Sequence, residues 1–295
     1  MTTIYYGFGP LVDNNSFLST VETSYGAWFE LIGDVHDAGS IGTGNAKSAN
    51  SEFSFNTGLS ITTGQLVVLV VATDNDSSAD GDNNEHLTVT IDGHSMTQIL
   101  EYTNSEGSAD AGVTVSAWYW KATTNVASAV AIVTTLTSGK TAKAASGRIF
   151  NIPYEYTVSI DGTQTGGTSA ADPESLIATG GNSGKHIWIR GIGVEDNHAD
   201  VGLLEQTVDW AAFSGDGTEG GLTDSNISVR AEFKISDGTS SGASNPSISS
   251  TPDTASVLVG LLISVASTII LPYNVNIFRS RIFTSTLFSR RVLLR

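Results

Sequence analysis

A short, strongly apolar run that ends in an acidic turn constrains this chain more than any other feature. The run is LVVLVVA at 66–72, and the turn after it carries Asp74 and Asp76. A continuous β-branched run of this length, bounded by turn residues, is typical of a strand buried on both faces. A similar pattern, HIWIRGIGVEDN, returns at 186–197. The echo predicts that the chain contains two copies of one β-rich unit.

Two further pairs of segments repeat in the same order along the chain. Residues 225–235 resemble 112–122, and residues 253–265 resemble 140–152. No window sustains the 3.6-residue apolar period of a long amphipathic helix, whereas short alternating runs between Gly, Asn and Asp are frequent. Many short strands separated by turn residues are typical of antiparallel sandwiches.

We therefore predict an all-β fold with two tandem antiparallel β-sandwiches of jelly-roll-like type. The predicted parts are an N-terminal arm at 1–16, a first sandwich at 17–152, a second at 153–265 and an Arg-rich C-terminal extension at 266–295. The first 16 residues can alternatively form an edge strand.

Alternation along the strands predicts which side chains meet in the cores. Leu66, Val68 and Val70 should share one face of a core strand, and Ile187 and Ile189 should take the equivalent place in the second unit. The glycine-rich stretches at 38–45 and 162–171 are expected to be loops. The uncharged stretch 255–271 is interpreted as a buried strand running into another, in preference to a membrane span.

Composition limits the classes of function. The 40% of hydrophobic residues suffices for a sizeable core, whereas charged residues make up only 15%, below the roughly 25% of an average soluble domain. Such hydroxyl-rich, sparsely charged surfaces are common in extracellular and virion β-proteins.

The absence of Cys excludes disulfides, thiolate metal sites and Cys nucleophiles. No signal peptide is expected from the first residues, which is compatible with release by lysis inside an assembled particle.

Charge is divided unevenly along the chain. All 30 acidic residues lie at or before Asp253 together with nine basic ones, a net charge of −21, whereas the last 42 residues carry five Arg and no acid. An acidic body argues against nucleic acid as the main partner. The extension mixes Arg with large apolar residues, so we expect an ordered anchor that holds the subunit in its assembly. The alternative is that the extension folds back onto its own second unit and covers an edge strand. Its candidate contact residues are Tyr273, Phe278, Arg279, Arg281, Phe283, Phe288, Arg290, Arg291 and Arg295.

Two other groups of residues are candidate binding sites. The carboxylates of Asp74, Asp76, Asp80 and Asp82 follow the key strand and offer the hard oxygen ligands that Ca²⁺ takes, although their spacing does not match a helix-flanked calcium loop and a solvated turn is favoured. Trp118 and Trp120 share one strand face. The favoured interpretation is that they cap the core, and the alternative is that they form a platform for sugar rings.

No catalytic constellation stands out. The letters GTSSG at 238–242 match a nucleophile elbow, but no helix signal and no His follow them. We therefore expect a protein that is not an enzyme.

The segments described above resemble a known class of proteins. An apolar strand ending in an acidic loop, the strand VTVSAWYWKAT at 113–123 and the final strand pattern AxxGRIFxI at 144–152 are similar to phage structural proteins with tandem jelly-roll or immunoglobulin-like modules. The resemblance covers roughly residues 50–265. It implies a virion protein of the decoration, head-fibre or tail-associated type, without enzymatic activity.

The sequence thus predicts a virion structural protein that contacts other virion proteins and forms a homo-oligomer. Neither nucleic acid nor membrane is expected as a partner. The alternative is a carbohydrate-binding adhesin or receptor-binding module that uses surface aromatics or the acidic loops.

Overall fold

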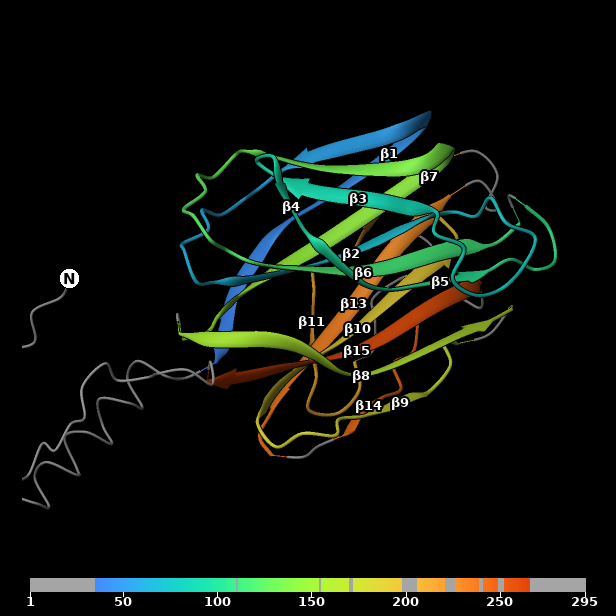
Figure 1. Ribbon diagram of the computed structural model, residues 1–295. Helices are drawn as coiled ribbons and strands as arrows, with labels where there is room; N and C mark the ends of the chain where they lie inside the picture. Colours follow the sequence, from blue (N-terminus) through green and yellow to red (C-terminus); the bar gives the residue numbers. More distant parts are fainter. Residues whose placement is uncertain are drawn as a thin grey trace, which may run out of the picture. The chain divides into compact units, whose positions relative to one another are not determined.

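The computed structural model describes residues 35–109, 111–153, 155–169, 172–197, 206–220, 226–238, 241–248 and 252–265 (Figure 1). Throughout these ranges the regular elements are β-strands. They are β1 (His36–Asn56), β2 (Leu66–Asp74), β3 (His86–Ile91), β4 (His94–Ser95), β5 (Thr97–Asn104), β6 (Val113–Lys121), β7 (Ala131–Asn151), β8 (Tyr156–Thr168), β9 (Leu176–Thr179), β10 (Lys185–Glu195), β11 (Ala211–Ala212), β12 (Asp216–Gly217), β13 (Ile227–Ser236), β14 (Ser241–Ser244) and β15 (Asp253–Val265).

The strands form two large sheets and one small one. The first half of the described chain builds a sheet with the order β4-β3-β7-β2-β6-β5, and β1 also pairs with β7. The second half builds a sheet with the order β11-β13-β10-β15-β8, in which β12 also pairs with β13. Strands β14 and β9 form the small sheet. The central pairings of both large sheets are antiparallel, so the predicted all-β antiparallel sandwich class is confirmed.

The sequence echo corresponds to a repeated strand order. In the first sheet β2 lies between β7 and β6, and in the second sheet β10 lies between β15 and β13. These are the three segment pairs that the sequence matches. Val70 lies opposite Ala117 and Ser146, and Ile189 lies opposite Phe233 and Val259 in the same arrangement. The two halves of the chain therefore share one three-strand plan.

One hydrophobic core is common to both sheets. Leu66, Val68 and Val70 of β2 belong to it together with Ile187 and Ile189 of β10, as alternation along the strands predicts. Close contact between the sheets requires small residues on β10. A Cβ atom added to Gly191 would lie 2.7 Å from Val70 Cγ1, and one added to Gly193 would lie 2.6 Å from Val113 Cγ2.

Each half also has a core of its own. Val67, Leu69 and Val71 point away from the common core into a cluster on the other face of the first sheet, with Trp118 and Trp120. On the outer face of the second sheet, Trp188 packs with residues from the small sheet and nearby segments: Leu176, Ala178, Trp210 and Leu258. The division into two tandem jelly-roll-like sandwiches stays a prediction, because the halves bury a common core besides these separate ones.

The two glycine-rich stretches are strands where the sequence predicts loops. Residues 38–45 lie within β1, and residues 162–168 form the second part of β8. Register shifts interrupt the pairing of β1 with β7 around Gly39 and Gly42, which have φ angles of 113° and 135°. Because glycine adopts positive φ without strain, it allows these β-bulges inside a continuous strand.

The uncharged stretch that begins at residue 255 is a buried strand over its described part, as predicted, since β15 is buried up to Ile263. No helix in the described ranges is long and apolar enough to cross a membrane. The predicted N-terminal arm and the C-terminal extension beyond residue 265 lie outside the described residues.

Candidate functional site

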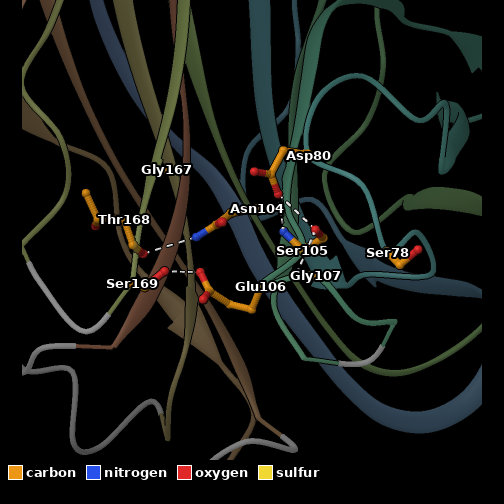
Figure 2. Close-up of a pocket in the computed structure, with 9 residues that line it drawn as sticks. All are labelled: Ser78, Asp80, Asn104, Ser105, Glu106, Gly107, Gly167, Thr168 and Ser169. Atoms are coloured by element: carbon orange, nitrogen blue, oxygen red, sulfur yellow. Dashed lines mark hydrogen bonds between the residues drawn. The ribbon is translucent and has the colours of Figure 1, made fainter.

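A polar pocket lies where loops of the first half meet the end of β8 (Figure 2). Its volume is about 440 Å³. Both halves contribute to its wall, through the segments after β2 and β5 and through the last residues of β8. The lining residues are Ser78, Asp80, Asn104, Ser105, Glu106, Gly107, Gly167, Thr168 and Ser169.

Hydrogen bonds fix the segments that form this pocket. Asp80 Oδ1 accepts from both the backbone N–H and the hydroxyl of Ser105, each at 2.9 Å. The side-chain amide of Asn104 donates to the carbonyl oxygens of Thr168 and Thr254, each at 3.1 Å. Asn104 and Ser105 are buried. Asn104 therefore links the two halves at the pocket, whereas Ser105 fixes the loop of Asp80 within the first half.

The mouth of the pocket carries a second carboxylate on a tight turn. Glu106 and Gly107 both have positive φ, 50° and 77°, which turns the chain sharply after β5. The hydroxyl of Ser169 donates to Glu106 Oε1 across the pocket, as Figure 2 shows. Glu106, Gly107 and Ser169 are exposed, so their polar groups are open to a ligand.

The pocket is electrostatically negative. Among the residues that the structure describes, no Lys, Arg or His forms an ion pair with Asp80 or Glu106. Burial raises the pKa of nearby Tyr102, and the charges of Asp80 and Glu174 raise it further. A negative potential with free carboxylate oxygens favours a ligand rich in hydrogen-bond donors or positive charge, and it disfavours an anion.

The structure does not bring the four candidate calcium ligands together. Asp74 accepts from the N–H of Ala142 at 2.8 Å, Asp76 forms an ion pair with Lys140 at 2.8 Å, and Asp82 accepts from the N–H of Asn84 at 3.1 Å. Only Asp80 lies in the pocket. No group of three or more His, Asp or Glu that could hold a metal occurs among the described residues.

A buried ionic network, which the sequence did not reveal, lies behind the acidic turn. Lys140 Nζ is 2.7 Å from Glu85 Oε2 as well as 2.8 Å from Asp76 Oδ1. Glu85 also accepts from the N–H groups of Asp76 and Ser77 and from the hydroxyl of Thr114. The network joins β3, β6 and β7 to the acidic turn, so it fixes the shape of that turn.

His86 lies in the same region and is uncharged. Thr73 donates its hydroxyl to the carbonyl of Asp74, so it is free to accept from His86 Nε2–H at 2.9 Å. Ser116 accepts from Trp118 Nε1–H, which leaves its hydroxyl to donate to His86 Nδ1 at 2.6 Å. Burial, together with the charge of Lys140, lowers the pKa of His86 to about 3.

The Ser116–His86 contact therefore contains the hydroxyl and the imidazole of a nucleophile–base pair, but neither group is accessible to a substrate. Both side chains are fully buried, and both ring nitrogens of His86 have protein partners. Glu101, whose carboxylate oxygen is 4.0 Å from His86 Nδ1, accepts instead from the backbone N–H groups of Glu85 and His86. This cluster stabilises the sheet and offers no open position for a substrate.

The second half buries a guanidinium with few partners. Arg190 Nη2 donates to the carbonyl of Glu174 at 2.6 Å, whereas Nε and Nη1 have no hydrogen-bond partner. Burial lowers the pKa of Arg190 to about 9, against the opposing effect of the Glu232 and Glu174 carboxylates. Glu232 lies opposite Arg190 on β13 and accepts from Thr207 and Ser244.

The two tryptophans that were candidates for a sugar platform are in the core on the face of the first sheet that points away from the second. Trp118 is 3% exposed and Trp120 is 8% exposed. His94 stacks on Trp120 with ring centroids 5.3 Å apart. Neither indole face is open to a ligand. The nine candidate anchor residues from Tyr273 to Arg295 lie outside the described residues.

No protein-family model matches the chain, and no curated protein matches it. The function is therefore argued from the chain's own charge, cores and pocket.

Proposed function

We propose that the protein is a non-enzymatic structural subunit of a virion, in which copies of the chain join a capsid or tail through protein–protein contacts. The observation that carries the proposal is the division of charge: an acidic β-sheet body of net charge −21 is followed by an extension of net charge +5. Like-charged bodies repel one another, whereas a basic extension is attracted to the acidic body of a neighbour.

The folded body supports a structural role. Its two large sheets share one core, and each has a further core on its other face. The buried Lys140–Glu85 pair and the bonds of Asn104 tie loops to this framework. Such a body suits a subunit that presents fixed surfaces to its neighbours.

The extension supplies the anchor in this proposal. Arginine keeps its charge and suits bidentate contacts with carboxylates. The extension carries five: Arg279, Arg281, Arg290, Arg291 and Arg295. The large apolar residues between them, Phe278, Phe283 and Phe288 among them, add burial at roughly 25 cal/mol per Å² of apolar area removed from water. The alternating residues 273–277 also suit addition to an exposed sheet edge.

The experiment compares the full chain with two variants by sedimentation velocity and electron microscopy. One variant ends after Pro272, and the other keeps the full length with all five extension arginines changed to Gln. We expect the full chain to associate into regular oligomers and both variants to stay folded monomers with an unchanged melting temperature. A truncated chain that aggregates, or that melts far earlier as a monomer, overturns the anchor because the extension then belongs to the subunit's own fold.

A further inference from the structure

Two carboxylates of the polar pocket each keep an oxygen without a partner. Asp80 uses Oδ1 for both bonds from Ser105, and Glu106 uses Oε1 for the hydroxyl of Ser169. Their second oxygens, Asp80 Oδ2 and Glu106 Oε2, have no hydrogen bond from the described part of the chain. Both residues are exposed at the pocket, so these oxygens can accept from a ligand.

Apart from the exposed hydroxyl of Ser78, the side-chain donors of the pocket are already used. The amide of Asn104 is committed to Thr168 and Thr254, and the hydroxyls of Ser105 and Ser169 point to the two carboxylates. A sugar usually exchanges hydrogen bonds in both directions and stacks on a ring, yet none of the nine lining residues is aromatic. The pocket is instead suited to a group that only donates and carries positive charge.

We infer that this pocket receives an arginine side chain from the extension at 279–295 of a second copy of the chain. This inference rests on the proposed function, because it names the surface on which the anchor docks. A guanidinium presents five N–H donors in a planar fork and no acceptor, which matches a wall of free carboxylate oxygens. Five arginines in the extension are available, and no acidic residue follows Asp253 to neutralise them within it.

The fold places the pocket far from the point where the extension begins. Ser264, at the end of β15, bonds to Thr157 at the start of β8, whereas the pocket lies at the other end of both strands, beside Thr254 and Thr168. At roughly 3.3 Å per residue, the ten steps from Thr254 to Ser264 separate the two ends by about 33 Å. An arginine of the same chain can also reach the pocket, because Arg279 follows Ser264 by 15 residues, so the test distinguishes docking within one chain from docking between copies.

The pocket is also preorganised for such a contact. It is formed by segments from both halves of the chain, and the buried Asn104 fixes them before any ligand arrives. Less conformational entropy of the pocket is then lost on docking, which favours binding of the basic extension.

The test uses the full chain and isosteric variants. Asp80→Asn with Glu106→Gln removes both charges but keeps the oxygens that Ser105 and Ser169 bind. A matched control, Glu52→Gln with Asp92→Asn, removes two exposed carboxylates elsewhere on the first sheet. By sedimentation equilibrium we expect self-association to weaken about tenfold in the pocket variant and to stay unchanged in the control.

A peptide assay isolates the pocket from the rest of the assembly. The probe is a fluorescent peptide of residues 273–295, titrated into the full-length chain whose own five extension arginines are changed to Gln. The dissociation constant should rise about tenfold when Asp80→Asn and Glu106→Gln are added to that chain. Reversing both charges, Asp80→Arg with Glu106→Arg, should restore binding of a peptide in which the five arginines are changed to Glu.

The outcomes separate the two proposals. If neutralising the extension leaves self-association intact, the proposed anchor itself is wrong. If neutralising the extension abolishes association but the pocket variant behaves like its control, the anchor stands and the pocket inference is overturned. A pocket variant that changes only the compactness of the monomer also overturns it, because the arginine would then come from the same chain.

Discussion

The two halves of the molecule repeat one strand order, but their buried charged side chains differ in how many partners they have. In the first half, Lys140 lies within 2.8 Å of two carboxylates, those of Glu85 and Asp76. In the second half, the guanidinium of Arg190 has one hydrogen bond and two donors without partners. The apolar faces that meet in the common core are alike, whereas the outer faces differ. The shared plan is therefore set by the common core, and the outer polar groups are free to diverge.

The largest expected effect comes from removing the paired charge. Lys140→Met leaves the buried carboxylate of Glu85 without its cation and should lower the free energy of unfolding by about 3–5 kcal/mol. Arg190→Met removes a guanidinium that, among the described residues, forms no ion pair and has two nitrogens without hydrogen-bond partners. The carboxylate of Glu232 keeps its bonds from Thr207 and Ser244. The cost of Arg190→Met should stay below about 1.5 kcal/mol.

Urea unfolding of both methionine variants, followed by circular dichroism, measures these two free energies. The same new side chain enters a fully buried position of a central sheet in each case, so the comparison is matched. Equal losses of unfolding free energy in the two variants would show that the ion pairs of Lys140 add no stability beyond that of an unpaired buried cation. The proposed contrast between the halves would then be wrong.

A smaller effect, about 2–5 kcal/mol, is expected from opening a cavity in the common core by Ile189→Ala. Since Ile189 of β10 packs in one cluster with Val68 and Val70 of β2, the destabilisation should extend to both sheets. Amide hydrogen exchange should then quicken in β2 and β6 as well as in β10 and β13. Faster exchange confined to β10, β13 and β15 would show that the halves unfold separately, as two tandem sandwiches would.

The sequence predicts the central strands well because their evidence is local. The run at 66–72 and its echo at 186–197 are β2 and β10, and alternation correctly assigns Val68 and Ile189 to the common core. The glycine-rich stretches within β1 and β8 were wrongly predicted as loops. Their strand conformation depends on pairing with β7 and β15, which supply the apolar partners that the stretches themselves lack.

The pocket and the ionic network could not be predicted in the same way. Asp80, Asn104 and Thr168 are far apart in the chain. A β-bridge between Gly81 and Thr103 brings the first two together, and the packing of the two sheets adds Thr168. Likewise, Lys140 is 55 positions from Glu85, and nothing in either local sequence marks the pair. The four aspartates between positions 74 and 82 are close in sequence, yet they have separate partners because the turn is held by backbone and lysine contacts.

The last expected effect separates the halves by pH. The pKa of His86 falls from 6.5 to about 3 on folding, so the unfolded chain binds this proton first as the pH drops. The stability that neutral His86 provides is complete above pH 6.5 and is lost as the pH falls toward 3. In the second half, burial alone raises the pKa of Asp161, but bonds from His186, Gly181 and Asn182 lower it from 3.8 to about 2. Its contribution is lost only below pH 3.8.

The first half should therefore be the acid-sensitive one. Between pH ~7 and pH ~5, the wild-type chain should lose about 2 kcal/mol more of its free energy of unfolding than a His86→Gln variant. The difference between the two chains is the relevant quantity, because burial also raises the pKa of Glu101, and its protonation offsets part of the loss in both. Asp161→Asn should leave the slope over this range unchanged. Parallel curves for the wild-type and His86→Gln chains would mean that His86 accepts its proton in the folded state, and that the first half has no acid sensitivity of its own.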